Sequence, residues 1–593
     1  MDTLKQPTQE PSGKKIQPPP PIRYQTLQPS SYSTPSWLRG DTRRTGAICY
    51  GILMLAALVI GCYHLSITGT LWPDGPQYAN AGAMIHDWIL SGDKLHPMQF
   101  AQEAYAQYPA FHLPFHPPVY PSLLALCFLV TGISYDAARI LVALLFGMGG
   151  CCFHAILRRL GTRPGTALAC ALLFLTTPEI AHWARDTMSE VPALALFLAG
   201  SYFFVTWLET RNPWHCLAAF ALAEMAFLSR VTILGLIPTW VLFTLLSGQM
   251  RRWRAPLPIL LLGGYFVFNA LWIKWVSRYA KYETFGDNSV QGSSHPLAAN
   301  LPTQQISFYA THFPAMAGGG LMLLGLGAAF VVLRHWPKRQ ENPAGTFWLS
   351  WLVSYVAFLL ATHLVPEQRY FVLALPALAG LVATLLRPTM DVLWSTRLVP
   401  ALIALSLALN LLLLGRIPRG VLGYRAVAQE TAELPAPGNI LSAVWMSQDF
   451  IFRYWASRSP VKRSIIRADR TLAIRLSDYG GFANRKVKST VLAHSRADVI
   501  HTLRRGRIRY LLTCAPLQGK PDSYDPEMVL AHEVARSTPQ QFSLIRQFPL
   551  LEEFEEGHLF EGRIYLWKFN GPLPPGPSDL PVVVPTADMV LKH

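Results

Sequence analysis

The stretch from Glu190 to Glu209 reads EVPALALFLAGSYFFVTWLE, and no charge interrupts it between its two end residues. About 20 apolar residues in a helix are enough to cross the hydrocarbon of a bilayer, so this stretch predicts a membrane-spanning helix. Similar apolar blocks recur from about Gly46 to Gly415, and after Arg416 the pattern becomes that of an ordinary globular domain. The fold is therefore decided by a long run of membrane helices.

The composition supports this interpretation. Of 593 residues, 51% are hydrophobic and only 15% are charged, whereas soluble domains carry about 25% charged residues. We predict a polytopic all-α membrane domain over residues 46–415, preceded by a disordered cytoplasmic tail at 1–45, which has no signal-peptide cleavage pattern. The eleven expected crossings are 46–68, 137–157, 166–180, 190–209, 214–229, 232–248, 256–276, 315–333, 346–363, 369–386 and 396–415.

The net charge of +16 is spread in a way that favours a membrane over nucleic acid. Basic clusters such as Arg43–Arg44, Arg158–Arg159 and Arg251–Arg254 lie beside apolar blocks, and such clusters stay on the cytoplasmic side. With the N-terminus inside, every strong basic cluster falls on one face. We therefore expect a multi-pass protein of the cytoplasmic (inner) membrane, with the loop 71–116 and its surface helices outside.

That topology requires the apolar block 118–133 not to cross. The block follows His116-Pro117-Pro118 and contains Pro121, which is a poor start for a spanning helix. We predict a re-entrant segment. The alternative is a true span, with two short neighbours such as 214–229 and 232–248 miscounted.

Residues 416–570 predict a soluble domain outside the membrane. Ile440–Trp445 and Ile508–Thr513 have the composition of strands, and Ala497–Arg505 is an amphipathic helix that ends at Gly506. This order indicates a periplasmic α/β domain, followed by a Pro-rich tail at 571–593. We expect the domain to cover the active cleft or to bind the acceptor.

Charged residues at a membrane boundary are costly, so each is a functional candidate. Asp74 directly follows the first crossing, beside Trp72 and Tyr78. Asp74 could instead have only a structural role, as the N-cap of an amphipathic surface helix over Tyr78–Leu90. Glu190 stands just before an apolar helix with Pro192 in its first turn, so it could likewise only cap that helix.

The remaining outer-loop residues have equally ordinary interpretations. Arg185 and Asp186 could simply pair with each other, and His112 and His116 are separated by a proline that makes a helical zinc spacing poor. No cofactor is indicated, and a requirement for a divalent metal stays open.

The order of these residues along the chain is more specific than any one of them. An Asp after the first crossing is followed by His-Pro-Pro-Val-Tyr120, by Ala-Arg185 with Glu190 before a span, by Leu228-Ser-Arg230-Val, and by Glu367-Gln-Arg-Tyr370. In this order the chain resembles the bacterial GT-C glycosyltransferases of the protein-mannosyltransferase and aminoarabinose-transferase type (family 39-like). The resemblance covers about residues 46–390.

The resemblance implies an integral-membrane enzyme that transfers a sugar from a polyprenyl-phosphate carrier to a lipid, glycan or protein hydroxyl, with inversion. Asp74 matches the family's catalytic base and Glu190 its second acidic position, with Asp186 as a further acidic candidate. Arg230 stands where relatives have Lys in a Thr-Lys-Gly-Pro pattern, so the local turn differs here. Gly75 occupies the place of a second loop-one acid.

Arginine and lysine suit a lipid phosphate, because guanidinium groups bind phosphate with paired hydrogen bonds. We expect Arg369, Arg230 and Lys94 to bind the donor phosphate, although Arg369 could instead be only an interface anchor. The residues expected around the donor and acceptor cleft are Tyr78, His116, Arg185, Glu367 and Tyr370.

Two other classes of function remain as alternatives. A transporter or flippase of lipid-linked glycans would show internal repeats and charges within its spans, and the sequence shows neither. A non-catalytic scaffold would act through its external domain and would tolerate substitutions in loop one.

Overall fold

The structure is a computed structural model, and it describes residues 36–65, 69–92, 95–111, 116–279, 301–362, 366–386, 397–435, 437–479, 485–515, 525–553, 559–584 and 589–592. Most of the predicted tail at 1–45, together with Lys94 and His112, lies outside these residues. The chain divides into two units, Met1–Ile48 and Cys49–His593. The contacts reported below belong to the second unit.

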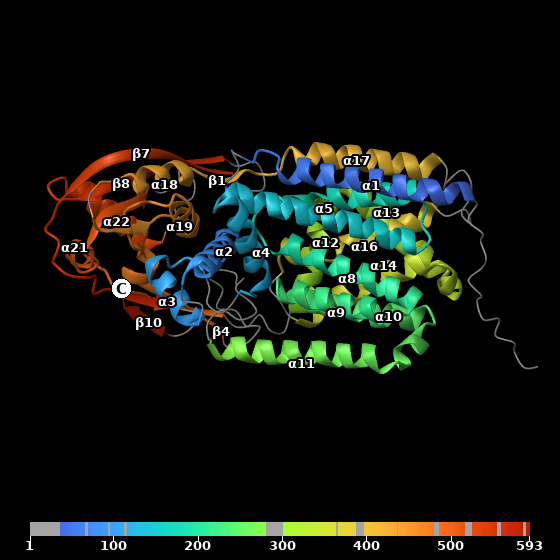
Figure 1. Cartoon of the computed structure of the whole chain (residues 1–593). Coiled ribbons are helices and arrows are strands. Elements are labelled where there is room, and N and C mark those ends of the chain that lie inside the picture. Colours follow the sequence, from blue (N-terminus) through green and yellow to red (C-terminus); the bar gives the residue numbers. More distant parts are fainter. Residues whose placement is uncertain are drawn as a thin grey trace, which may run out of the picture. The chain divides into compact units, whose positions relative to one another are not determined.

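The first part of the chain is helical (Figure 1). Its α-helices are α1 (Ser36–Gly61), α2 (Asp74–Leu90), α3 (Pro97–Gln107), α4 (Val119–Thr131), α5 (Tyr135–Arg159), α6 (Pro164–Thr176), α7 (Pro178–Trp183), α8 (Glu190–Thr210), α9 (Pro213–Phe227), α10 (Pro238–Leu246), α11 (Pro256–Tyr279), α12 (Leu301–Ala317), α13 (Gly319–Arg334), α14 (Pro343–Thr362), α15 (Gln368–Phe371), α16 (Leu375–Val382) and α17 (Val399–Leu414). Short 3-10 helices occur at Val231–Leu236, Met250–Arg254, Trp336–Glu341 and Ala383–Leu386.

Several of these helices are long and apolar enough to cross a membrane. Within the part of the chain that the structure describes there are five, or up to six if a helix pair bent by 114° at Gly318 counts as one span. The five are Arg44–Gly61, Tyr135–Arg159, Glu190–Thr210, Pro256–Val276 and Pro343–Thr362. The other apolar helices are shorter, among them α6, α16 and α17. The chain is a multi-pass membrane protein, as predicted.

The bent pair lies in α12 and α13 and not in the predicted re-entrant segment. Residues 118–133 instead form α4, a helix of 13 residues that packs on α2. Such a helix spans only about 20 Å, so α4 alone is too short to cross the hydrocarbon of a bilayer. The assignment of residues 118–133 as a re-entrant segment stays a prediction.

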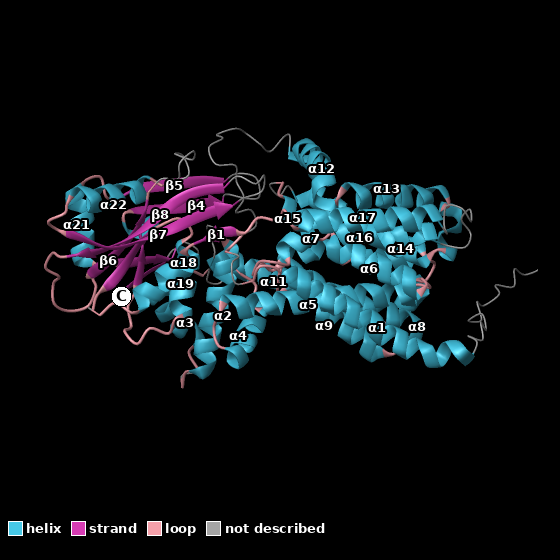
Figure 2. Ribbon diagram, turned by 90° about the horizontal axis from the view of Figure 1, so that it is seen from above, coloured by secondary structure: helices cyan, strands magenta, loops and turns pink. Residues whose placement is uncertain are grey.

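The predicted surface helix is mostly covered in the structure. α2 begins at Asp74, four residues before the predicted start, and residues Gly75–Ala83 are all buried. α4 packs on α2 and α19 (Ser447–Ala456) packs on it from the C-terminal domain, so protein rather than lipid covers much of its apolar side (Figures 1 and 2). Much of α2 is therefore covered by other parts of the chain, and its position at the membrane surface stays a prediction.

The C-terminal part is a mixed α/β domain. Its helices are α18 (Tyr424–Ala432), α19, α20 (Ala468–Thr471), α21 (Arg496–Arg505) and α22 (Pro526–Ser537). Its strands are β1 (Gly420–Leu422), β2 (Asn439–Ala443), β3 (Ile465–Arg467), β4 (Ala473–Tyr479), β5 (Arg485–Val491), β6 (Ile508–Cys514), β7 (Phe542–Glu553), β8 (Leu559–Phe569), β9 (Pro581–Val584) and β10 (Met589–Lys592). The hairpin β9–β10 lies in the region predicted as a Pro-rich tail.

Six strands form the main sheet in the order β1-β7-β8-β6-β2-β3. β3, β2 and β6 run parallel, whereas β8, β7 and β1 are antiparallel to their neighbours. Alternate residues of β2 point to opposite faces, with Ile440 in one apolar core and Leu441 in the other. α18 and α19 cover the first face, and α21 and α22 cover the second.

The sheet is joined to the start of the first loop. Thr70 forms a β-bridge with Val421 of β1, and the Val421 amide donates to the Thr70 carbonyl over 3.0 Å. Gly420 has a φ of +74°, and a Cβ there would lie 2.4 Å from the Thr70 oxygen, so only glycine allows this approach. The bridge fixes Leu71, Trp72 and Asp74 at the boundary of the two domains.

Candidate active site

Asp74 and Arg369 form an ion pair at the N-terminal end of α2. The Arg369 guanidinium lies 2.7 Å from Asp74 Oδ2 and also binds the Glu367 carboxylate. Arg369 is buried, whereas the Asp74 side chain keeps 23% of its surface exposed. Asp74 is the first residue of its helix and follows the capping residue Pro73, so its alternative role as the N-cap is not what the structure shows.

A second, buried ion pair joins the start of α8 to the segment that follows α9. Arg230 lies 2.9 Å from Glu190 Oε1, and its guanidinium also donates to the Ser189 hydroxyl over 3.2 Å. Ser189 in turn donates to the Tyr78 hydroxyl over 2.9 Å. This chain of contacts ties the middle of α2 to the start of a long apolar helix.

Tyr370 brings the two arginines together. Its ring lies 5.5 Å from the Arg230 guanidinium carbon and 5.4 Å from that of Arg369, and Trp72 lies 5.2 Å from Arg369 on another side. The ring faces attract the cations and shield them from water. The predicted residues Asp74, Tyr78, Glu190, Arg230, Glu367, Arg369 and Tyr370 therefore form one cluster, which we call the charge cluster.

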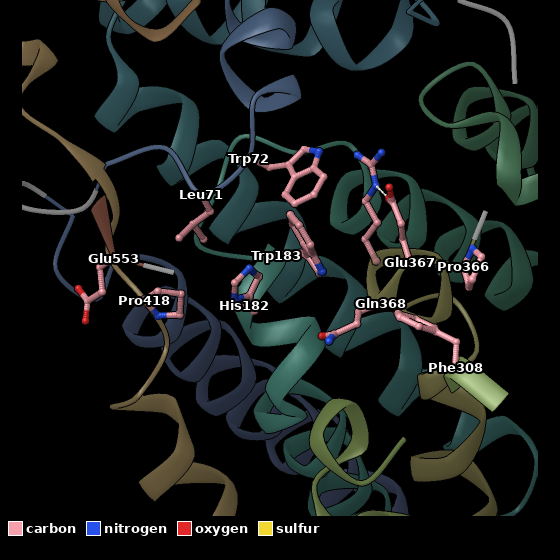
Figure 3. A pocket seen from close by; sticks show the side chains of 11 residues that line it. Leu71, Trp72, His182, Trp183, Phe308, Pro366, Glu367, Gln368, Pro418 and Glu553 are labelled. Carbon is pink, nitrogen blue, oxygen red and sulfur yellow. Dashed lines mark hydrogen bonds and ion pairs between the residues drawn. The ribbon is translucent and has the colours of Figure 1, made fainter. Parts of the chain in front are cut away.

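A cavity of about 290 Å³ opens beside the charge cluster (Figure 3). Arg369 and Glu367 form part of its wall, and the rings of Trp72 and Trp183 face it. Its lining residues are Leu71, Trp72, His182, Trp183, Phe308, Pro366, Glu367, Gln368, Arg369, Pro418 and Glu553. A cavity with aromatic walls and one buried cation suits a ligand that joins an apolar part to an anion.

Asp186 has a different place from the one predicted. It is fully buried and accepts hydrogen bonds from the amides of Leu71, Trp72 and Thr187 and from the Tyr135 hydroxyl. Burial raises the pKa of Asp186 to about 6. With four donors around its carboxylate, Asp186 holds the first loop in position.

Gly75 explains why this loop can approach so closely. A Cβ at position 75 would lie 2.8 Å from Asp186 Oδ1 and 2.9 Å from Thr187 Oγ1. The space beside Gly75 is thus filled by the neighbouring loop. A side chain at position 75 would displace Asp186 and Thr187.

Arg185 points away from the charge cluster. Its Nε donates to the Ile60 carbonyl at the end of α1, and its guanidinium lies over Tyr63. Arg139 donates to the carbonyls of Gly61 and Leu65 nearby. Both arginines therefore satisfy carbonyls that the end of α1 leaves without helical partners. The predicted pairing of Arg185 with Asp186 does not occur.

Other predicted residues lie at the edge of the site. His116 stacks on Tyr78, with ring centroids 4.2 Å apart. Lys94 lies outside the described residues. Among the residues that are described, no group of three or more His, Cys, Asp or Glu side chains could hold a metal ion.

Sequence reasoning missed several residues of the site. Trp183 and His182 line the cavity, and Ser189 and Tyr135 bind the charge cluster or Asp186. For His182, Trp183 and Ser189, the only signal in the sequence was their closeness in the chain to Asp186 and Glu190. Tyr135 carries no signal, because a tyrosine at the start of a spanning helix is ordinary.

The apolar helices, the α/β domain and the buried cations where these two parts meet define the class: a multi-pass membrane protein with a soluble domain, as predicted. Residues 115–275 match the family model for dolichyl-phosphate-mannose-protein mannosyltransferase. Among curated protein sequences, none matches significantly.

The fold is that of ArnT from Cupriavidus metallidurans. The crystal structure of that protein bound to undecaprenyl phosphate is 14% identical, with 86% of this chain and 97% of that chain covered and a TM-score of 0.50. For its apo state the identity is 14%, the coverages are 87% and 98%, and the TM-score is 0.51. These matches confirm the predicted resemblance to the protein-mannosyltransferase and aminoarabinose-transferase type.

Proposed function

We propose that this chain transfers a sugar from a polyprenyl-phosphate-linked donor to a hydroxyl of a lipid, glycan or protein acceptor, with inversion and with Asp74 as the base. The observation that carries this proposal is the ion pair between Asp74 and Arg369, because Arg369 also lines the cavity where the two domains meet. The family match at residues 115–275 and the ArnT fold support the reaction class. The ArnT structure contains undecaprenyl phosphate, which is the kind of ligand that Arg369 would bind here.

Arg369 is the main group for the donor phosphate. A guanidinium binds phosphate oxygens with paired hydrogen bonds, and in a buried site each such bond is stronger than in water. Arg230 adds a second positive charge, 5.5 Å from the centre of the Tyr370 ring that Arg369 also contacts. When a phosphodiester binds Arg369, it competes with the Asp74 carboxylate for the guanidinium, and Asp74 becomes available to the acceptor.

The chemical step then needs little else from the protein. The acceptor oxygen attacks the anomeric carbon, the bond from that carbon to the phosphate oxygen breaks, and the acceptor proton passes to Asp74. Polyprenyl phosphate leaves as an anion held by Arg369. Because the leaving group is already a stabilised anion, no general acid is required.

Glu367 can adjust the charge of the site. Burial raises the pKa of Glu367, even though Arg369 is beside it. An incoming phosphodiester would raise this pKa further, because a like charge disfavours the ionised carboxyl. Proton uptake by Glu367 would then offset the negative charge that the donor brings.

The finer topology is part of the proposal. We assign eleven crossings between residues 46 and 415, in which the shorter apolar helices complete the five or six long ones, and a non-crossing segment at 118–133. The N-terminus is cytoplasmic and the domain 416–570 lies outside. The basic clusters at Arg158–Arg159 and Arg251–Arg254 support this orientation, because they then share the cytoplasmic side.

The proposal is tested with the purified full chain and a lipid extract that contains polyprenyl-phosphate sugars. Mass spectrometry should detect free polyprenyl phosphate with the wild-type chain and none with Asp74→Asn. Comparison of lipid, glycan and protein fractions from a deletion strain identifies the sugar and the acceptor. Equal release by both chains would remove Asp74 from the role of base.

One observation favours a flippase of lipid-linked glycans as a second candidate. The bend of 114° between α12 and α13 resembles the broken helices of transporters. In that case fluorescent polyprenyl-phosphate sugar would cross the bilayer of liposomes that contain the chain, and Asp74→Asn would leave that movement unchanged.

A further inference from the structure

A separate crevice of about 190 Å³ lies in the C-terminal domain where it meets the first loop. Three walls come from the ends of parallel strands: Val444–Gln448 follow β2, Arg467 ends β3, and Asp525 and Met528 begin the helix after β6. The fourth wall is Pro73, the residue before Asp74. The full lining is Pro73, Val444, Trp445, Met446, Ser447, Gln448, Arg467, Asp469, Asp525 and Met528.

The position in the sheet is the one where α/β domains bind ligands. From β2 the chain passes through α19 to β3 on one side, and from β6 it passes through α22 to β7 on the other side. The connections therefore leave β2 and β6 in opposite directions, which makes a topological switch point between them. In open α/β sheets, ligands bind at such a point, outside the carboxyl ends of the strands.

The crevice and the cavity beside Arg369 meet at consecutive residues. Trp72 lines the cavity, Pro73 lines the crevice, and Asp74 follows them. A base that deprotonates an acceptor toward a donor must lie between the two substrates. Asp74 directly follows one residue of each lining, so it adjoins both openings along the chain.

The crevice is also fixed relative to α2. The Asn80 side chain donates to the Gln448 carbonyl, one of the lining residues, over 3.1 Å. Asp87 accepts from the Trp455 indole over 2.8 Å and pairs with Arg458 at 2.7 Å. α19 therefore holds the crevice in a constant position along the helix that begins with Asp74.

The groups in the crevice suit hydroxyls. Asp469 and Asp525 offer carboxylates that accept hydrogen bonds, and Arg467 offers a guanidinium that is paired with Asp469 at 2.6 Å. The indole N–H of Trp445 is buried and has no hydrogen-bond partner among the described residues. An aromatic ring beside carboxylates and a guanidinium presents an apolar face together with donors and acceptors, as a sugar ring does. The crevice is smaller than the ~300–1,000 Å³ of sites for drug-sized ligands, so it suits a single sugar unit.

We propose that this crevice binds the sugar unit of a saccharide acceptor and presents one of its hydroxyls to Asp74. The inference rests on the proposed function, because it names the acceptor class of that same reaction. The membrane-side cavity would then hold the donor, and the C-terminal domain would select the acceptor.

Binding is measured by saturation-transfer NMR with the detergent-solubilised full chain and millimolar methyl glycosides of mannose, glucose, glucosamine and arabinose. At least one glycoside should give a signal with the wild-type chain. Asp525→Asn should weaken its binding about tenfold, as loss of one charged hydrogen bond implies, and Met528→Trp should abolish it by filling the crevice. Glu533→Gln, on the exposed face of the same helix, is the matched control and should bind normally.

Undecaprenyl phosphate binding by each variant shows that it is folded and reports on the donor side alone. If no glycoside binds the wild-type chain, or if Met528→Trp binds as well as Glu533→Gln, the inference is overturned. A signal from the tripeptide Ala-Thr-Ala in place of the glycosides overturns the saccharide class. If glycosides bind in the crevice but no polyprenyl phosphate is ever released, the proposed function fails while the sugar site stands.

Discussion

The guanidinium of Arg369 lies 2.7 Å from the carboxylate of Asp74, although 295 positions separate them in the chain. α15 brings Arg369 to this point, and the Thr70–Val421 bridge and Asp186 bring the first loop to it. A loop that follows the first crossing and a short helix at the start of the tenth predicted crossing thus build one site. This contact shows how residues that each gave only weak evidence of function in the sequence come together in one site.

Asp74→Asn should abolish sugar transfer while the chain still folds. The amide keeps the shape of the side chain but cannot take the acceptor proton, so the rate should fall about 10²–10⁴-fold. Release of polyprenyl phosphate from the donor measures this rate. Asp136→Asn, which alters a more exposed carboxylate outside the charge cluster, should transfer normally, and an active Asp74→Asn chain would contradict the assignment.

Arg369→Ala should raise the apparent KM for the lipid donor by about tenfold or more, because a charge-assisted contact to phosphate is lost. Titration of the donor against initial rate gives this value. Arg425→Ala, at an exposed guanidinium in the C-terminal domain, provides the comparison. An unchanged KM would leave Arg369 as a structural anchor only.

Glu190→Ala should lower stability strongly, because it leaves the buried Arg230 without its partner. Breaking a buried pair in this way costs about 3–5 kcal/mol. The double variant Glu190→Ala/Arg230→Ala should recover part of that loss, since no uncompensated charge remains. Thermal unfolding in detergent of both single variants and the double variant tests this, and additive losses would show that the 2.9 Å contact carries no coupling.

Asp87→Ala should lower kcat and leave the KM for the donor unchanged. Asp87 joins α2 to Trp455 and Arg458 of the C-terminal domain, so its loss lets the helix that carries Asp74 move without changing Arg369. We expect a fall in kcat of about tenfold, as small displacements of a catalytic group produce. Asp87→Glu should restore part of the rate, and a change in KM alone would argue against a positioning role.

Asp186 should make stability depend on pH. Burial raises its pKa from 3.8 to about 6, so its contribution to the free energy of unfolding is fully present below pH 3.8 and is lost as the pH rises through 6. The shift corresponds to on the order of 3 kcal/mol. The stability difference between the wild-type chain and Asp186→Asn, which cannot ionise, should shrink from pH 4 to pH 7. A difference that is constant with pH would refute this.

The sequence predicted most of the charged residues of the site but not all of their roles. Asp74, Arg230 and Arg369 were found because charge at the end of an apolar block is rare and costly. Asp186 was found as an acid, but its four hydrogen-bond donors come from other segments, so its role in holding the loop could not be foreseen. Arg185 was assigned to the cleft because it lies near Glu190, and the fold turns it toward the end of α1.

By itself, the sequence determined the class of protein. Blocks of apolar residues long enough to cross a bilayer and the change of pattern after Arg416 are local properties, and local hydrophobicity decides what lies in lipid. Only the tertiary structure decided which charges meet, that α2 is covered by α4 and α19, and that a crevice opens at Pro73. The physical reason is that pairing a buried charge depends on contacts between segments far apart in the chain, and no local pattern records those contacts.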